Sequence, residues 1–310
     1  MSGRVRVTAV VLNWNGTDDT VACVQSLLAL ETGDAELDIL VVDNGSRQSP
    51  AAPIKAVAPQ VPILFTGANR GYAGGNNAGI RYAAARGADF IWVLNNDAVV
   101  ERDALAPLLE SAAANPCAGV LGSRILRADD ASRVWVAWGR VTWRQSLVAL
   151  EGEDASDGPR YHGEHDVEWI PGCALLFRSR ALAEVGGFDE SFFAYHEDVD
   201  WAARAAGAGW KCRYVGRSRV IHRVHGSSGG ASYYGGFRKY LSARNSVLYA
   251  RRHGRPWQVA WMAACILATF PFQLLRRSVR GEGAGVVIKA RGWMDALRGR
   301  PLPLKDLGLR

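Results

Sequence analysis

The sequence has few cysteines, five in 310 residues, and no two of them are spaced as Cys-x-x-Cys. A disulfide framework uses an even set of cysteines, and a zinc knuckle uses closely paired ones. The sequence therefore argues against both, and a reducing compartment fits best. The N-terminus reads Met-Ser-Gly-Arg-Val-Arg-Val and runs directly into a predicted strand, so we expect no secretory signal.

Acidic residues are scarce in the C-terminal third. Residues 204–310 contain 21 Lys and Arg but only three Asp and Glu, a net charge of +18. The rest of the chain carries 16 bases and 27 acids, a net charge of −11. This asymmetry predicts that the second part of the chain faces an anionic partner, which the charge alone leaves open between nucleic acid, anionic lipid and a phosphorylated substrate.

Composition and hydrophobic patterning predict a globular α/β protein. Hydrophobic residues make up 48% of the chain and charged residues 22%, which is enough to bury a core. Apolar runs typical of strands lie at 5–12, 37–42, 63–65, 90–94 and 119–126. Between them lie segments predicted to be helical: 17–30, a segment that ends near residue 86, and 101–114. We therefore expect a mostly parallel central sheet flanked by helices, with ligands bound beyond the carboxyl ends of its strands.

The later segments predict a change of organisation. The patterns predict strands within 134–150, a surface loop over 151–165, a strand over 169–177 and a helix over 194–206. The stretch 226–230 and the pair Gly235-Gly236 predict flexible connections. We expect a first domain over residues 1–225 and a basic, partly hydrophobic helical region over residues 226–310.

Polar residues follow two predicted strands. Asn95-Asn96-Asp97 comes directly after the apolar run 90–94. A divalent cation held by such a carboxylate can neutralise the charge on a nucleotide diphosphate leaving group. Asp43 ends another strand and can accept a hydrogen bond from a base or a ribose. Taken alone, each motif also fits an ordinary polar turn, with Asp97 capping a helix or Asp43 forming an Asx turn.

A glycine-rich segment, residues 69–77, leads into the third predicted helix. Gly71, Gly74 and Gly75 allow the backbone to approach a ligand, and the helix N-terminus offers N–H groups to phosphate. The alternative is a tight loop with ordinary capping. The spacing differs from the Gly-x-Gly-x-x-Gly of dinucleotide-binding proteins, so we do not predict NAD binding.

A cluster of acids, His196-Glu197-Asp198-Val199-Asp200-Trp201, begins another predicted helix. An acceptor hydroxyl attacks only when a base takes its proton, and an ionised carboxylate can serve. On a helix these carboxylates point in different directions, so one or two should face the site. The others can pair with Arg204 or cap the helix, and an acidic helix start is also favoured by the helix dipole.

Two further features admit more than one interpretation. His222 follows a strand-like stretch and can complete the coordination of a metal, or be an ordinary surface histidine. Residues 257–275 contain no charged residue. The length of this uncharged run is close to the roughly 20 residues that a membrane-spanning helix needs. Arginines flank the run on both sides, so we favour a helix lying in the membrane interface, anchored by aromatic residues such as Trp257 and Trp261. A buried C-terminal helix or a dimer contact is the alternative.

With these residues in view, the chain resembles the inverting family 2 glycosyltransferases of the GT-A fold, and most of all their rhamnosyltransferase-like branch. The matching stretches follow the family order over about residues 5–225. They are residues 10–16, 41–46, 69–77, 94–97, 186–190 and 196–201.

The resemblance implies a role for each matched position. Asp198 would be the catalytic base, and Glu197, Asp200 and Trp201 would form or support the acceptor site. Asp97 would bind Mg²⁺ or Mn²⁺, together with Asn95 and His222. The donor would be bound by Asn13, Asp43, Asn69, Gly74, Asn76 and Asn96. Asn95 departs from the family pattern because it replaces a carboxylate, and one charge fewer should weaken cation binding.

The activity that the resemblance implies is sugar transfer from a nucleotide diphosphate to a glycan hydroxyl, in the assembly of a cell-surface polysaccharide. The preferred donor is dTDP-L-rhamnose, with UDP- and GDP-sugars left open, and the preferred acceptor is a polyprenyl-diphosphate-linked glycan. We expect a cytoplasmic protein, peripheral at the inner face of the plasma membrane, that contacts the anionic membrane surface through its C-terminal region. A homodimer stays open.

Three rival functions remain. A nucleotidyltransferase also places carboxylates and metal at a strand edge, but it would usually carry a glycine- and lysine-rich loop near the N-terminus, where this chain has Asn13-Trp14-Asn15-Gly16. A nucleic-acid-binding protein explains the basic segment and leaves the acidic part unexplained, so we predict no nucleic-acid partner. The third is a scaffold protein without catalytic activity, which stays possible because Asn95 replaces a carboxylate of the family pattern.

Overall fold

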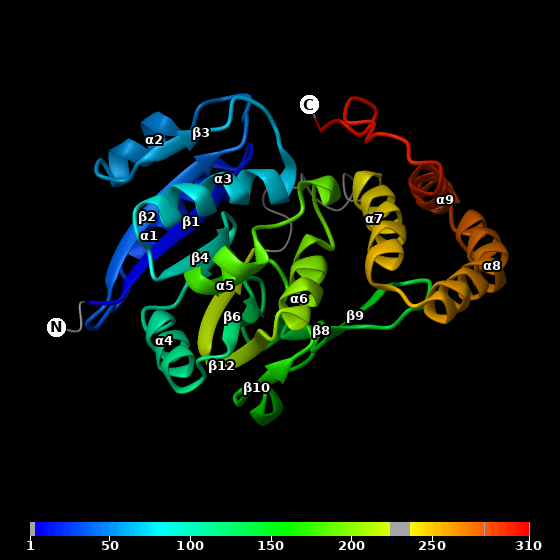
Figure 1. Ribbon diagram of the computed structural model, residues 1–310. Helices are drawn as coiled ribbons and strands as arrows, with labels where there is room; N and C mark the ends of the chain where they lie inside the picture. Colours follow the sequence, from blue (N-terminus) through cyan, green and yellow to red (C-terminus); the bar gives the residue numbers. More distant parts are fainter. Residues whose placement is uncertain (1–3, 224–235, 282, 310) are drawn as a thin grey trace.

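The computed structural model describes residues 4–223, 236–281 and 283–309 (Figure 1). A ten-stranded mixed sheet has the order β10-β12-β6-β11-β4-β1-β2-β3, with β5 beside β12 and β7 beside β6. Its parallel half consists of β1 (Arg6–Asn13), β2 (Glu36–Asp43), β3 (Ile63–Phe65) and β4 (Phe90–Asn95). The expected α/β fold with a mostly parallel central sheet is confirmed for these strands.

The second half of the sheet is mixed. Strand β11 (Ala174–Arg178) runs antiparallel to β4 and to β6 (Ala118–Arg127), and β6 runs parallel to β12 (Lys211–His222). The remaining strands are β5 (Ala98–Val100), β7 (Val134–Val136), β8 (Trp138–Val141), β9 (Val148–Glu151) and β10 (Glu164–Val167). This arrangement brings the ends of β4 and β12 to the same edge, because β5 follows β4 and pairs with the end of β12.

Helices cover both faces of the sheet, as the continuous apolar strands require. One face packs against α1 (Thr17–Leu28), α2 (Ala51–Val57) and α4 (Leu105–Ala114). The other packs against α3 (Gly71–Ala85), α5 (Ser179–Val185) and α6 (Glu197–Gly207). The layers can be followed in Figure 1.

Several predicted boundaries differ from the structure. The helix predicted over 101–114 begins only at Leu105. Glu101 lies outside the helix and forms an ion pair with Arg219 of β12. The strand predicted over 169–177 begins at Ala174. The loop predicted over 151–165 is interrupted by a 3₁₀ turn, Pro159–Tyr161, and by β10, which pairs with β12.

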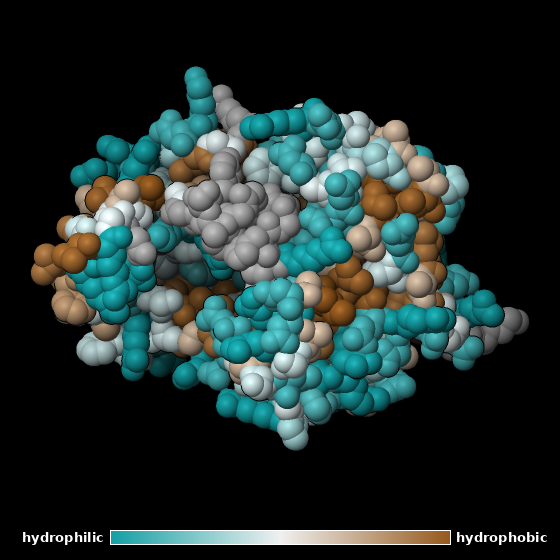
Figure 2. Space-filling view, turned by 180° about the vertical axis from the view of Figure 1, so that it is seen from behind, coloured by the Kyte–Doolittle hydropathy of each residue, from teal (hydrophilic) through white to brown (hydrophobic). Residues whose placement is uncertain are grey.

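Three helices form the described part of the C-terminal region: α7 (Phe237–His253), α8 (Pro256–Val279) and α9 (Gly283–Leu297). The predicted domain boundary at 225/226 and the predicted flexible stretch 226–230 lie outside the described residues. Helix α9 packs along α7. Helix α8 is long and apolar enough to cross a membrane, judged by length and composition, and little of it is buried. Figure 2 shows hydrophobic side chains at the left edge, where these helices lie.

Candidate active site

A cavity of about 350 Å³ opens at the carboxyl edge of the sheet. Its walls come from the ends of β1, β2 and β4, from the segment that leads into α6, and from the start of α7. The polar groups around it include Asn44, Asn69, Asn95, Asn96, Asp97, His196, Glu197, Asp198 and His222, and the aromatic ones include Trp14, Tyr72, Trp135, Trp169, Phe193 and Tyr195. Carboxylates from two distant segments therefore meet in one cleft.

Asp97 and His222 form a buried pair in this cavity. The Nε2 atom of His222 lies 3.0 Å from Oδ1 of Asp97, and the Asp97 side chain is only 8% exposed. Burial opposes protonation of His222, but the interactions with Cys173 and Asp97 outweigh it and raise the pKa of His222 to about 10. The indole of Trp135 lies against the imidazole, with ring centroids 4.3 Å apart. A metal cation at Asp97 would compete with protonated His222 for the carboxylate of Asp97.

The donor set around Asp97 fits a divalent cation that shares its coordination with a substrate. Among residues 4–223, 236–281 and 283–309, no three or more His, Cys, Asp and Glu side chains are grouped to hold a metal by themselves. Mg²⁺ is commonly held by one or two carboxylates together with substrate phosphates. Asp97 and His222, with Asn95 in the same wall, match that pattern. The Nδ1 atom of His222 is buried without a hydrogen-bond partner.

Asn96 joins two elements of the protein through its amide nitrogen. Its Nδ2 atom donates to Gly16 O at 2.9 Å and to Thr20 Oγ1 at 3.1 Å. These bonds join the end of β4 to the first turn of α1. Asn96 borders the cavity, and its amide nitrogen holds the wall in place. The donor-binding role expected from the sequence stays a prediction.

Asp198 lies in the first turn of α6 with both carboxylate oxygens held by backbone amides. Gly172 N donates to Oδ2 at 2.9 Å, and Val199 N donates to Oδ1 at 2.8 Å. Burial raises the pKa of Asp198 to about 6, and these two amides limit the rise. The carboxylate is therefore ionised at neutral pH and is a stronger base than an ordinary aspartate, which suits a general base.

Burial shifts the pKa values of Glu197 and His196, the two residues that precede Asp198, in the direction that favours their neutral forms. Burial, followed by the charge of Asp198, raises the pKa of Glu197 well above its usual value. Its Oε2 atom is buried without a hydrogen-bond partner. Burial lowers the pKa of His196 to about 4. Burial raises the pKa of both carboxyl groups, and it raises that of Glu197 further because the charge of Asp198 adds to the effect.

The predicted donor-side residues form a buried network. Asn13 Nδ2 donates to Asp43 Oδ1 at 2.9 Å, so the end of β1 orients the carboxylate at the end of β2. Asn69 accepts from Gly71 N at 2.9 Å. Its own amide donates to Leu309 O at 2.9 Å, which brings the C-terminal segment to the rim of the cavity. Gly71 has φ of +71°, and a Cβ there would lie 2.3 Å from Phe193 O, so glycine is required at this position.

Gly74 and Asn76 are the remaining residues predicted to bind the donor. Both lie inside α3 and do not border the cavity. A Cβ on Gly74 would lie 2.8 Å from Arg70 Cβ and 3.3 Å from Glu190 Oε2. Asn76 is fully buried and donates to Tyr72 O within the helix. The absence of a Cβ at Gly74 therefore allows Arg70 and Glu190 to lie close to the α3 backbone.

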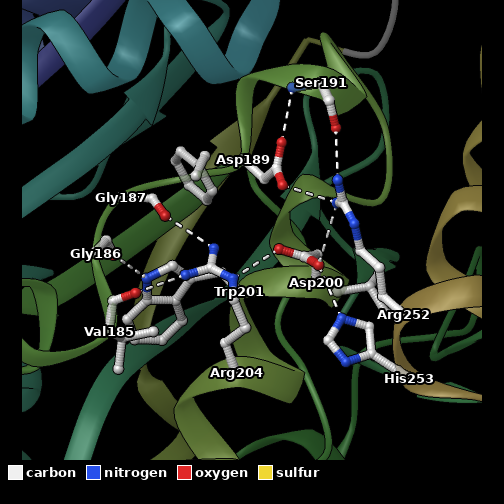
Figure 3. Close-up of polar contacts among 12 residues, drawn as sticks. Val185, Gly186, Gly187, Asp189, Ser191, Asp200, Trp201, Arg204, Arg252 and His253 are labelled. Carbon is white, nitrogen blue, oxygen red and sulfur yellow. Dashed lines mark hydrogen bonds and ion pairs between the residues drawn. The ribbon is translucent and has the colours of Figure 1, made fainter.

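Asp200 and Trp201 are not among the residues that line the cavity, and Figure 3 shows Asp200 turned toward Arg204, Arg252 and His253. Asp200 is 1% exposed and accepts from Arg204 Nε at 2.8 Å, as the four-residue spacing predicts, and contacts His253 Nε2 at 2.8 Å. Burial raises its pKa, but hydrogen bonds from His253 and Arg204 outweigh this and lower it. Trp201 donates to Gly186 O and packs edge-on against Phe177. Both residues support the helix that carries Asp198.

Sequence reasoning missed several residues of the cavity wall. Tyr72 donates its hydroxyl to Gly172 O, next to the amide that holds Asp198. Trp135 and Trp169 were predicted only as parts of strands. Phe237, Arg238 and Ser242 come from α7, in the region predicted to be a separate membrane-associating part. Tyr72 lies in the glycine-rich segment 69–77, which was the available signal for it, and no sequence signal indicated the two tryptophans or α7.

Comparison with known proteins identifies relatives of this arrangement. Residues 8–184 match the family model described as glycosyl transferase family 2. An N-acetylglucosaminyl-diphospho-decaprenol L-rhamnosyltransferase of Mycobacterium tuberculosis is 30% identical over 285 residues, covering 82% of this chain and 88% of the relative. A low-salt glycan biosynthesis hexosyltransferase of Haloferax volcanii is 24% identical over 247 residues, covering 78% and 74%.

Solved structures share the fold. A mannosyltransferase from Pyrobaculum calidifontis in complex with GDP-Man and Mn²⁺ superposes with a TM-score of 0.59 at 17% identity, covering 96% of this chain and 88% of that one. GalNAc-T7 with UDP, GalNAc and Mn²⁺ gives a TM-score of 0.59 at 15% identity, covering 86% and 55%. These neighbours confirm the GT-A fold. The family match over more than half of the sequence, with the identity to the mycobacterial protein, shows that this chain belongs to glycosyl transferase family 2.

Proposed function

We propose that this glycosyltransferase is metal-dependent and inverting, and that it transfers L-rhamnose from dTDP-L-rhamnose to a hydroxyl of a polyprenyl-diphosphate-linked glycan. The observation that carries the proposal is that Asp97 and Asp198 border one cavity. One carboxylate is available to the departing diphosphate and the other to the incoming alcohol. The identity to the mycobacterial L-rhamnosyltransferase supports the choice of sugar and of a lipid-linked acceptor.

The donor side comprises the ends of β1, β2 and β4. Asp43, oriented by Asn13, is the proposed contact for the nucleoside, and Asn69 forms the rim on that side. Asp97 and His222, with Asn95, are the proposed metal ligands. A bound divalent cation would neutralise the charge that develops on the departing diphosphate.

Asp198 is the proposed catalytic base. Its carboxylate takes the proton of the acceptor hydroxyl, whose oxygen then forms a bond to the anomeric carbon as the bond to the diphosphate oxygen breaks. A single displacement of this kind inverts the anomeric centre. The amides of Gly172 and Val199 fix the carboxylate, so little reorganisation is needed when the proton moves. Burial raises the pKa of Glu197, which favours a protonated carboxyl group that can donate a hydrogen bond to a sugar hydroxyl.

The C-terminal helices supply the proposed membrane contact. Trp257, Trp261 and Phe272 of α8 are each more than half exposed, and a cluster of arginines follows at the end of the helix. An exposed apolar face beside arginines matches the interfacial helices that bind anionic membranes. This contact would hold the enzyme at the inner face of the plasma membrane, where a polyprenyl-linked acceptor is found.

The test is a panel of nucleotide sugars incubated with purified protein, a short-chain polyprenyl-diphosphate glycan and Mn²⁺ or Mg²⁺. The proposal predicts release of nucleoside diphosphate and a mass gain on the acceptor with dTDP-L-rhamnose, and loss of both with a chelator. Turnover with a UDP- or GDP-sugar alone would reject the donor assignment and keep the transferase. Retention of the anomeric configuration in the product would reject the single displacement.

A further inference from the structure

The segment that leads into Asp198 has an unusual backbone. Phe193, Tyr195 and His196 all have positive φ, at +65°, +68° and +70°. Non-glycine side chains rarely adopt this left-handed region, because Cβ then crowds the backbone. Such a conformation persists only where surrounding contacts impose it. Residues 192–196, here called the catalytic loop, therefore need an external support.

Helix α7 provides that support through Asn245. This side chain is fully buried, and its Nδ2 atom lies 2.9 Å from Phe192 O, 2.8 Å from Ala194 O and 2.7 Å from Tyr195 O. One amide group thus contacts three carbonyl oxygens of the catalytic loop. Its Oδ1 atom accepts from Arg244 Nη1 at 3.0 Å, which fixes the orientation of the amide.

The other end of α7 holds both flanks of the loop (Figure 3). Arg252 pairs with Asp189 at 2.8 Å and donates to Ser191 Oγ at 3.0 Å, before the loop. His253 contacts Asp200 at 2.8 Å, after it. Residues of α7 therefore contact the segment 189–200 at its start, middle and end. Asp198 lies within this segment.

We propose that Asn245 is a positioning residue for sugar transfer: by bonding the catalytic loop it places Asp198 at the cavity. The helical C-terminal region is then part of the catalytic machinery as well as the proposed membrane contact. This inference rests on Asp198 being the base. Its chemistry is indirect, because Asn245 reaches the reacting atoms only through the loop.

A competing interpretation is that Asn245 only stabilises the fold. The two differ in what they predict for the folded protein. A residue that only stabilises would lower the melting temperature and leave the turnover of the remaining folded enzyme unchanged. A positioning residue changes kcat at a temperature where the protein is folded, while donor binding, which is proposed for other residues, survives.

The test compares Asn245→Asp with Ser246→Ala. Asn245→Asp keeps the size of the side chain but replaces the NH2 group by a single oxygen that faces three carbonyl oxygens, so the loop should relax. Ser246 is the matched control, since it is also buried and its hydroxyl bonds only to Ala243 O inside α7. Activity is measured as nucleoside diphosphate release, and donor affinity by calorimetry, on protein shown to be folded by circular dichroism.

The expected result for Asn245→Asp is a fall in kcat of roughly a hundredfold, the effect of a misplacement of about 1 Å, with donor Kd unchanged. Ser246→Ala should match the wild type. Unchanged kcat in a folded Asn245→Asp protein would overturn the inference. If Asn245→Asp does not fold, Arg252→Gln, which alters a partly exposed side chain, is the deciding variant. A lowered kcat at constant donor KM supports the positioning role, and a wild-type kcat overturns it. A wild type without transferase activity would instead reject the proposed function itself.

Discussion

Asp97 and Asp198 border the same cavity, although Asp97 follows β4 and Asp198 lies in the first turn of α6. The two carboxylates have different environments. Asp97 is paired with His222, and Asp198 accepts hydrogen bonds from two backbone amides. This difference gives each a separate task in the account above, one at the donor diphosphate and one at the acceptor hydroxyl.

The first prediction concerns pH. Asp198 must be ionised to act as a base, and its pKa is raised to about 6 by burial. We expect kcat/KM to fall about tenfold for each pH unit below about 6, because the protonated fraction then dominates. The profile is measured by product release between pH 5 and 8, with donor binding followed over the same range. A rate that stays level down to pH 5 would contradict the raised pKa.

The second prediction concerns the metal. Asn95→Asp adds a carboxylate beside Asp97, and the affinity of a site for a divalent cation rises with the charge of its ligands. We expect half-maximal activity at a Mn²⁺ concentration about tenfold lower. Asp97→Asn is the opposite control and should raise that concentration. If neither variant shifts the metal dependence, this wall of the cavity does not hold the cation.

The third prediction concerns stability. Asp200→Asn removes a buried charge that pairs with Arg204 and contacts His253. Breaking a buried pair from one side should cost roughly 3 kcal/mol of unfolding free energy, measured by urea denaturation. The matched control is Glu184→Gln, which breaks an exposed pair of the same spacing with Arg180 and should cost less than about 1 kcal/mol. Equal losses in the two variants would show that the Asp200 network contributes little.

The fourth prediction concerns membranes. Deleting α8 and α9 would also remove the packing of α9 on α7, so surface substitutions are the better test. The combined variant Trp257→Ser, Trp261→Ser and Phe272→Ser should bind anionic vesicles about a hundredfold more weakly, since each large apolar side chain contributes on the order of 1 kcal/mol when partly inserted. Leu28→Ser alters an exposed residue of α1 and should have no effect. Vesicle binding that is unchanged in the triple variant would assign α8 to another role.

Much of the site could be predicted because its residues follow regular elements. The apolar run before Asp97 indicates a buried strand, and the ends of parallel strands share an edge of the sheet. The Asp200–Arg204 pair follows from helical spacing alone. In each case the prediction needed only a local period and a general rule of topology.

The remaining features depend on contacts between distant segments. No sequence pattern marks the positive φ of Phe193, Tyr195 and His196, since glycine is the usual marker, and the predicted helix therefore began at 194 where the structure begins it at Glu197. A Cβ at Gly74 would crowd Arg70 and Glu190. The sequence alone does not distinguish such a packing requirement from close approach to a ligand. The partner of Asn245 is a set of backbone carbonyls, which leave no trace in residue identity.

The most direct measurement of the central claim is a comparison of donor binding and turnover in the wild type and in Asp198→Asn. Asparagine keeps the shape of the side chain and cannot take the proton, so we predict that turnover falls by at least about a thousandfold. Binding of dTDP-L-rhamnose with Mn²⁺ should persist, because Asp97, His222 and Asp43 are untouched. Turnover of the variant near the wild-type rate would show that Asp198 is not the base and would contradict the division of roles between the two carboxylates.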